Sequence, residues 1–484
     1  MRTYLLLVLF PLLTFAQGSF DQSLFDRYDS FKESSLINRR FKHRDLQPLL
    51  ESLKGEPGFT VTSLGVSIQG RSISMVSMGQ GEKDVLLWSQ MHGDESTATM
   101  ALFDIFNYLK ENTELLSGTR VHFIPMLNPD GAELFTRRNA IGIDLNRDAI
   151  RLQSPESRIL KRVRDSLDAD YGFNLHDQSR YYNALETDKP ATLSFLAPAF
   201  NEAKEMSEKR GDAMKIIALM NEVVQKHAPG QVGRYSDAFE PRAFGDNMQK
   251  WGTRTILIES GGHPGDREKQ FIRKLNFVAI LTALKSISDN SYREISVKKY
   301  WEIPRNDRKL FDLKIENLTF PYLGADYTVD LGVVYEEVEN QSHTEFYYVG
   351  RIADIGDLST HFGYETLDAA GLAFKTGETY PKVVSDFEAF RELDIPQLLK
   401  EGYTTVPIDD LPEEIKFTPY PINIVDLRKI RIPKNNQMPK PPLGFEKNPS
   451  FLLTKDGKVV FAVINGFVYR TEGDENRVKN GLVE

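Results

Sequence analysis

The 484-residue sequence contains no cysteine, which excludes disulfide bonds, thiolate metal sites and cysteine nucleophiles. It also lacks runs of basic residues and carries a formal net charge of −9, which argues against nucleic acid or an anionic membrane as a partner. Beyond residue 16 no stretch is apolar enough to span a bilayer. The remaining composition, 40% hydrophobic and 27% charged, is that of an ordinary globular protein long enough for two or three domains.

The first 16 residues have the pattern of a secretory signal peptide. Arg2 precedes an apolar stretch, which ends at Ala16. The stretch is shorter than the roughly 20 residues that a membrane-spanning helix needs. We therefore expect a signal peptide over residues 1–16 and a secreted or periplasmic protein.

Strand and helix patterns alternate over residues 17–290. The apolar runs 85–91 and 121–126 predict strands buried on both faces, and a helical pattern over 98–109 lies between them. Further elements are predicted as helices over 157–168, 202–226 and 266–287, and as strands into His176 and over 253–258. The alternation predicts an α/β catalytic domain with a mixed, mostly parallel sheet and helices on both faces.

Residues 291–484 show short alternating apolar runs, which predict a β-rich accessory region made of one unit or two small subdomains. Two proline-rich stretches, 406–421 and 433–442, are typical of irregular connectors. A hairpin is predicted over 451–464, with its turn at Asp456 and Gly457.

Four side chains at predicted strand ends indicate a metal-dependent hydrolase. His92 and Glu95 follow the apolar run 85–91, and His176 ends another apolar run. A hydrolytic zinc site needs three ligands of this kind and one position for water, whose pKa the ion lowers toward about 7. Glu259 also ends a strand, where a carboxylate is costly unless it faces an open site, and it is the predicted general base.

The order of four segments, His92–Glu95, Asn128–Gly131, Gly142–Arg147 and Phe173–His176, resembles that of the zinc metallocarboxypeptidases, the family of the pancreatic and bacterial carboxypeptidases. The resemblance covers roughly residues 45–290 and implies that family's fold. It also implies one Zn²⁺ ion on His92, Glu95 and His176, with Glu259 as the catalytic glutamate.

The resemblance further assigns roles around the metal. Asn146 and Arg147 would bind the terminal carboxylate of the substrate, since a guanidinium pairs with a carboxylate through two hydrogen bonds. Arg137 would stabilise the oxyanion, although Arg138 competes for this role. Asp144 would orient His92, and Tyr235 is the candidate for the tyrosine that caps the substrate.

One feature departs from the family pattern, and another leaves the preferred substrate side chain undetermined. Asp148, Ala149 and Ile150 follow Arg147 where the family often has Asn-Phe after its Asn-Arg pair. No strong charge marks the pocket for the substrate side chain, for which Gly245 and Asp246 are candidate lining residues.

The predicted function is that of an exported zinc exopeptidase, a metalloprotease that removes C-terminal residues from peptides with a free carboxylate. One alternative is an amidase that trims peptidoglycan stem peptides. Another is a non-catalytic binding protein, with the β-rich region recognising a polymer or a partner. The oligomeric state stays open, as does the task of residues 291–484, either a lid over the cleft or a docking module.

Overall fold

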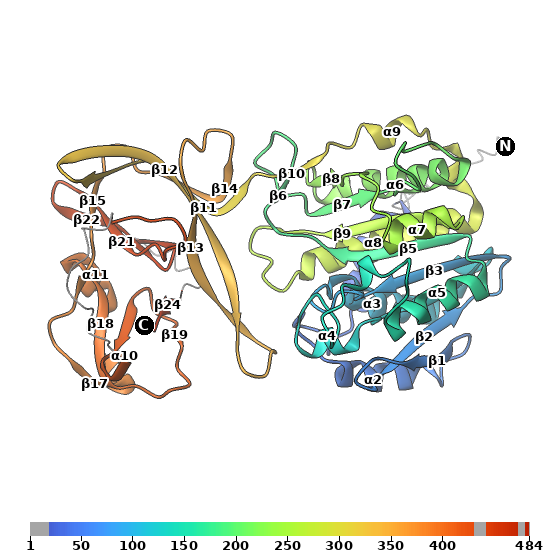
Figure 1. Ribbon diagram of the computed structural model, residues 1–484, viewed down its shortest axis with the longest axis horizontal. Coiled ribbons are helices and arrows are strands. Elements are labelled where there is room, and N and C mark those ends of the chain that lie inside the picture. The colour runs from blue at the N-terminus through green and yellow to red at the C-terminus, as the bar shows by residue number, and fades with distance from the viewer. Residues whose placement is uncertain (1–18, 430–441, 473–479, 484) are drawn as a thin grey trace, which may run out of the picture.

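The computed structural model describes residues 19–429, 442–472 and 480–483. An eight-stranded sheet forms the centre of the first region, in the order β1-β2-β4-β3-β5-β9-β7-β8 (Figure 1). Its strands are β1 (Thr60–Val66), β2 (Ser72–Met78), β3 (Lys83–Ser89), β4 (Thr119–Ile124), β5 (Tyr171–Asp177), β7 (Leu193–Leu196), β8 (Val232–Arg234) and β9 (Arg254–Ser260). The central strands β4, β3, β5 and β9 are parallel, whereas β1, β2 and β7 join through antiparallel pairs. The prediction of a mixed, mostly parallel sheet is confirmed.

Helices cover both faces of this sheet, as predicted. They are α1 (Phe20–Arg27), α2 (His43–Leu53), α3 (Thr97–Glu111), α4 (Pro129–Glu133), α5 (Pro155–Leu167), α6 (Glu208–His227), α7 (Phe244–Lys250), α8 (Gln270–Asp289) and α9 (Lys298–Trp301). One core cluster joins α3, α6 and α8 to Val85 and Leu87 of β3, and a second joins α5 and α7 to Leu86 and Trp88. Both faces of β3 are thus buried, which explains its continuous apolar run.

Two predicted helices begin later in the chain than their apolar pattern indicated. The helix predicted from residue 202 begins at Glu208, because the Ser207 side chain accepts a hydrogen bond from the Arg210 amide. The helix predicted from residue 266 begins at Gln270, because the Asp266 carboxylate accepts from the amides of residues 270–272. In both cases a capping side chain, rather than the apolar periodicity, determines the first turn.

The region beyond residue 303 is β-rich, which confirms that prediction. Its strands are β10 (Asn306–Arg308), β11 (Leu310–Tyr322), β12 (Ala325–Glu339), β13 (Phe346–Gly356), β14 (Phe362–Asp368), β15 (Ala373–Lys375), β16 (Glu378–Thr379), β17 (Val384–Asp386), β18 (Tyr403–Asp410), β19 (Phe417–Thr418), β20 (Asn423–Asp426), β21 (Phe451–Lys455), β22 (Lys458–Ile464), β23 (Phe467–Arg470) and β24 (Gly481–Leu482). Two short helices, α10 (Phe387–Arg391) and α11 (Ile395–Glu401), accompany them. The predicted hairpin of β21 and β22 is present.

Two core clusters lie on opposite faces of that hairpin. Leu453 and Val463 belong to one cluster, and Leu452 and Ala462 belong to the other, so the two halves of the accessory region share a sheet. The connector predicted over 406–421 is wrong for its first residues, because β18 continues to Asp410 with strands on both sides. Most of the second predicted connector, residues 433–441, lies outside the described residues, as does the signal peptide predicted over 1–16.

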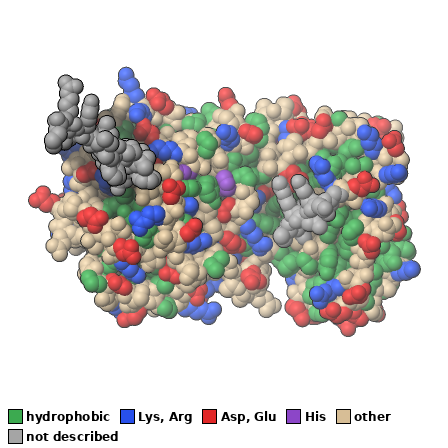
Figure 2. Space-filling view, turned by 180° about the vertical axis from the view of Figure 1, so that it is seen from behind, with side chains coloured by type: hydrophobic (Ala, Val, Ile, Leu, Met, Phe, Trp, Pro, Cys, Tyr) green, Lys and Arg blue, Asp and Glu red, His purple; other side chains and the backbone are tan. Residues whose placement is uncertain are grey.

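The core of the first region continues beyond residue 290. Tyr292, Tyr300 and Ile303 are buried in the core of the first region, and the domain boundary near residue 290 stays a prediction. Within the described ranges, no helix has the length and apolarity to cross a membrane. The face seen in Figure 2 carries basic and acidic side chains interspersed, without an extended basic patch.

A buried ion pair connects α3, α8 and the N-terminal segment. Arg273 donates to both carboxylate oxygens of Asp104, at 2.7 Å through Nε and at 2.5 Å through Nη2. Tyr28 and the Glu33 amide donate to the same carboxylate at 2.9 and 2.7 Å. Both side chains of the pair are fully buried. Removal of one partner would leave a buried charge without compensation.

We therefore expect Asp104→Ala to lower the free energy of unfolding by about 3–5 kcal/mol, measured by denaturant unfolding. The matched control is Asp289→Ala, which breaks the exposed pair of Asp289 with Lys285 at 2.7 Å on α8. An exposed pair of this kind contributes at most about 1 kcal/mol. Similar losses in the two variants would contradict the assigned role of the buried pair.

Candidate metal centre and substrate cavity

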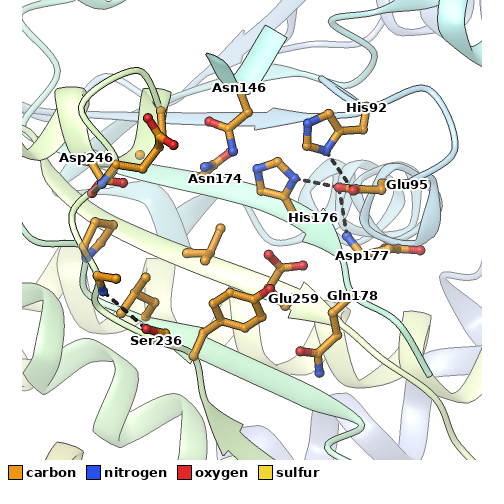
Figure 3. A pocket seen from close by; sticks show the side chains of 18 of the residues that line it. His92, Glu95, Asn146, Asn174, His176, Asp177, Gln178, Ser236, Asp246 and Glu259 are labelled. Carbon is orange, nitrogen blue, oxygen red and sulfur yellow. Dashed lines mark hydrogen bonds and ion pairs between the residues drawn. The ribbon is translucent and has the colours of Figure 1, made fainter. Parts of the chain in front are cut away.

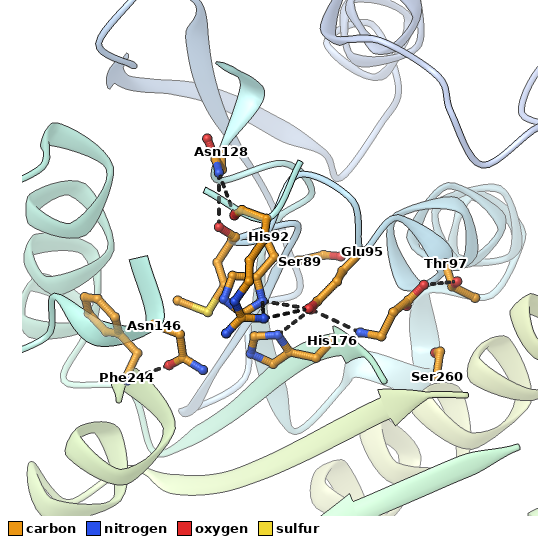
Figure 4. Close-up of polar contacts among 12 residues, drawn as sticks. Ser89, His92, Glu95, Thr97, Asn128, Asn146, His176, Phe244 and Ser260 are labelled. Carbon is orange, nitrogen blue, oxygen red and sulfur yellow. Dashed lines mark hydrogen bonds and ion pairs between the residues drawn. The ribbon is translucent and has the colours of Figure 1, made fainter. Parts of the chain in front are cut away.

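Three potential metal ligands converge at the carboxyl ends of β3 and β5. His92 Nδ1 lies 2.7 Å from Glu95 Oε1, and His176 Nδ1 lies 2.6 Å from Glu95 Oε2 (Figure 4). One candidate ligand atom from each residue lies within 4.8 Å of the other two, and all three side chains are buried. The three residues predicted as a metal site are therefore brought together.

The loop that carries His92 is held by the segment Asn128–Gly131. A Cβ atom on Gly93 would lie only 2.0 Å from the carbonyl carbon of Gly131, so the close approach of the two backbones requires glycine. Asn128 accepts a hydrogen bond from the Gly131 amide at 3.0 Å and donates to the Met91 carbonyl at 3.3 Å. This motif therefore braces the ligand loop rather than facing the cavity.

The sheet register places Glu259 beside the metal site. His176 of β5 pairs directly with Glu259 of the parallel strand β9. Figure 3 shows both side chains in the same pocket, with Glu259 below His176 and Glu95 in this view. Burial and the negative charge of Glu95 raise the pKa of Glu259 well above its ordinary value.

The chemistry of the ligand set fits zinc. Two imidazoles and one carboxylate are a common ligand set for a hydrolytic zinc ion. Burial disfavours the charge on Glu95, but the two histidines outweigh it and lower its pKa well below the ordinary value. Burial also opposes a charge on His92, yet Glu95 and Asp144 raise its pKa to about 9. A cation bound by His92, Glu95 and His176 would balance the buried negative charge of Glu95.

Asp144 links His92 to Arg137. Its Oδ1 lies 3.1 Å from His92 Nε2, and its Oδ2 accepts from Arg137 Nε at 3.0 Å. Arg137 Nη1 then lies 3.1 Å from His92 Nδ1 and 3.3 Å from Glu95 Oε1, so this guanidinium reaches the metal centre. Arg138 instead donates to the Gly142 carbonyl at an exposed position. The geometry thus favours Arg137 over its neighbour.

Asn146 and Arg147 line the same cavity as the metal centre, and Figure 3 shows His176 between Asn146 and Glu259. The Asn146 side chain accepts from the Phe244 amide at 2.9 Å, which joins it to the start of α7. Arg147 is about one-third exposed, and its Nε lies 3.4 Å from the carboxylate of Glu240. Both residues border open space, as their predicted role requires.

One cavity of about 400 Å³ contains this site. All of the predicted site residues except Asp144 line it: His92, Glu95, Arg137, Asn146, Arg147, His176, Tyr235 and Glu259. Asp144 contacts His92 from outside the cavity. The ring of Tyr235 lies 5.8 Å from that of Tyr182, a second lining residue. Gln178, Ser179 and Tyr182 are among the lining residues that were not predicted, because their loop follows no periodic pattern.

Of the two candidate residues for the side-chain pocket, Gly245 and Asp246, only Asp246 carries a charge. It lines the cavity with Asn174, Gly245 and Leu257 (Figure 3). Burial raises the pKa of Asp246 to about 6. Within the described part of the chain, the Asp246 carboxylate has no ion-pair partner, and it accepts a hydrogen bond from the Glu240 amide at 3.1 Å.

Comparison with known proteins identifies relatives of part of this chain. Residues 49–168 match the family model described as zinc carboxypeptidase. The human carboxypeptidase N catalytic chain is 30% identical over 139 residues, which cover 23% of this chain and 30% of that protein. Mouse carboxypeptidase M is 31% identical over 109 residues, 18% of this chain and 25% of that protein. A solved metallo-carboxypeptidase from Burkholderia cenocepacia aligns with a TM-score of 0.44 and 18% identity, over 52% of this chain and 70% of that chain.

These matches confirm the resemblance to zinc metallocarboxypeptidases, a family of zinc-dependent hydrolases. The chain spans between a quarter and a third of the length of the two curated relatives named above. The matched segment contains His92 and Glu95, whereas His176 and Glu259 lie beyond it.

We expect the purified protein to bind one zinc ion per chain, and His176→Ala to lose it, measured by elemental analysis after dialysis. The matched control is His122→Ala. His122 is also buried in the sheet, but it is hydrogen-bonded to Ser77 at 2.8 Å and Asp84 at 3.0 Å, away from the cavity. Retention of zinc by the His176 variant, or equal loss in the control, would argue against this metal site.

Proposed function

We propose that the protein is an exported zinc-dependent metallocarboxypeptidase that hydrolyses the C-terminal peptide bond of peptides. One observation carries the proposal: a buried set of two histidines and one glutamate shares a cavity with a second glutamate and two arginines. Export is supported by the pattern of residues 1–16 alone.

A zinc ion on His92, Glu95 and His176 would supply Lewis acidity, which polarises a carbonyl and lowers the pKa of water. Glu259 would take the proton of the attacking water and pass it to the leaving amine. Burial and the charge of Glu95 raise the pKa of Glu259, which makes its carboxylate a stronger base than an exposed glutamate. The Arg137 guanidinium would offset the negative charge that develops on the carbonyl oxygen.

The remaining residues would determine which bond is cut. Asn146 and Arg147 would bind the free terminal carboxylate, so that only the last peptide bond reaches Glu259. Tyr235, together with Tyr182, would cover the bound peptide end from the other side of the cavity. Asp144 would hold His92 in orientation through its hydrogen bond.

The direct test is Glu259→Gln, which keeps the shape of the side chain and removes the base. We expect kcat to fall by about 10²–10⁴-fold with zinc content unchanged, because general-base catalysis contributes a factor of this size. The assay follows, by mass spectrometry, the release of single residues from peptides with a free C-terminus and from their amidated counterparts. Activity within tenfold of the parent would rule out this mechanism.

The same assay separates the alternatives. Peptidoglycan stem peptides, offered beside ordinary peptides, would be the preferred substrate if the protein is an amidase of the cell wall. A protein that binds no zinc and releases no residue from either substrate would be a binding protein that uses the fold as a scaffold.

Asp246 predicts a preference for a basic C-terminal residue. A cationic side chain in the pocket would pair with this half-buried carboxylate, and a charge-assisted hydrogen bond contributes roughly 1.5–3 kcal/mol. We expect Asp246→Asn to lower kcat/KM for peptides ending in arginine by about 10–100-fold, with little change for peptides ending in leucine.

The preference should also depend on pH. Because the pKa of Asp246 is raised to about 6, its carboxylate becomes protonated as the pH falls through that value. The parent should therefore lose its preference for arginine over leucine between about pH 7 and pH 5, whereas the Asp246→Asn variant should show no such change. Equal hydrolysis of the two peptides by the parent at pH 8 would contradict the assignment.

A further inference from the structure

The segment from Gln178 to Ala184 connects the substrate cavity to the accessory region. It follows His176 almost directly, and it contributes Gln178, Ser179 and Tyr182 to the cavity wall. Its last residues form β6 (Tyr182–Ala184), which pairs with β10 at the start of the accessory region (Figure 1). Within this short segment, residues that line the cavity alternate with residues that contact the accessory region.

Backbone and amide contacts fix this segment at both ends. Arg308 of β10 pairs with Tyr182 in the two-stranded sheet. The Leu310 amide donates to the Tyr181 carbonyl at 3.1 Å, and Asn306 Nδ2 donates to Gln178 Oε1 at 2.9 Å. The conformation of the cavity wall is thus tied to the first strands of the accessory region.

Between these ends, Arg180 and Tyr181 project into the accessory sheet and bind Asp312 of β11. Arg180 pairs with one carboxylate oxygen of Asp312, and the Tyr181 hydroxyl donates to the other at 2.7 Å. The Tyr335 amide of β12 donates to the same carboxylate at 2.6 Å. The Asp312 side chain is only 1% exposed, so its charge depends on these partners.

The accessory sheet also contacts the backbone beyond Glu259. Tyr364 of β14 donates its hydroxyl to the Arg180 carbonyl at 2.7 Å. A Cβ atom on Gly262 would lie 2.3 Å from that hydroxyl and 2.8 Å from Cβ of Arg180. The strand end that carries Glu259 and the loop that follows His176 therefore meet at the same accessory side chain.

A second contact reaches the loop before Arg137. The guanidinium of Arg40 lies 4.0 Å from the ring of Phe135 and 4.6 Å from that of Phe346 in β13. The same side chain pairs with Glu337 and Glu339 of β12. Lys42 donates to the carbonyls of Glu133 and His343, both at 2.7 Å. All described residues that line the cavity nevertheless come from the range 92–259, so none of the described accessory residues forms part of its wall.

We propose that the accessory region positions the wall of the substrate cavity, with Asp312 acting through Arg180 and Tyr181 as the main positioning residue. It acts on the backbone that carries Gln178, Ser179 and Tyr182, rather than as a lid or as a separate docking module. The zinc ligands and Glu259 are held by the central sheet, so the accessory contacts govern substrate binding more than the chemical step. The kinetic part of this inference rests on the proposed function.

The test uses the full chain with Tyr181→Phe, which removes the hydroxyl bound to Asp312, and with Asp312→Asn, which removes the charge. We expect KM for peptides to rise at least fivefold, kcat to stay within about twofold and zinc content to stay unchanged. Amide hydrogen exchange in residues 177–184 should become faster. The matched control is Glu336→Gln on β12, which breaks only an exposed pair with Arg351 and should change none of these.

The exchange rates and the KM values together support or overturn the inference. Faster exchange together with a raised KM supports positioning, and Arg180→Lys should then retain more of the parent KM than Arg180→Met. Unchanged exchange in residues 177–184, or faster exchange with unchanged KM, overturns it. If the parent releases no residue from any peptide, the proposed function fails, and the exchange measurement alone decides whether Asp312 fixes the segment.

Discussion

The geometry of the site depends on one buried carboxylate held by two imidazoles. Each oxygen of Glu95 faces a different histidine, at 2.7 and 2.6 Å, and the two histidines come from segments more than 80 residues apart. A buried charge of this kind is stable only when it is paired, so the loop after β3 and the end of β5 must both be correctly formed. Because the carboxyl ends of parallel strands meet at one edge of the sheet, Glu259 of β9 is brought to the same place.

A motif shared with a family of enzymes need not consist of catalytic groups. Asn128 and Gly131 hold the loop of His92, and Asp130 accepts hydrogen bonds from Ser67, Gln69 and Arg71 in the hairpin of β1 and β2. Asp130 is buried and lines no part of the cavity. The segment therefore stabilises the backbone on which the metal site is built, and its substitution would act on the site through His92.

The sequence predicted the residues of the central sheet better than those of the loops. His92, His176 and Glu259 each end an apolar run, so their convergence follows from the parallel sheet alone. Ser179 and Tyr182 could not be predicted in this way, because the path of their segment is set by pairing with β10, more than 120 residues later in the chain. The predictions for the helices that begin at Glu208 and Gln270 were several residues too early. Capping side chains determine these starts, and the apolar pattern does not reveal them.

The charges of the cavity also bear on how a free carboxylate would be recognised. Arg147 already has the Glu240 carboxylate 3.4 Å from its Nε, so a substrate carboxylate would have to replace that contact rather than meet a free cation. Both side chains of this pair are about one-third exposed, and such pairs contribute little to stability. A substrate carboxylate that binds the guanidinium through both oxygens would compensate for the lost contact with Glu240. An internal peptide carbonyl bears no charge and cannot replace the Glu240 carboxylate at Arg147. The contact with Glu240 would therefore strengthen the preference for peptides with a free C-terminal carboxylate.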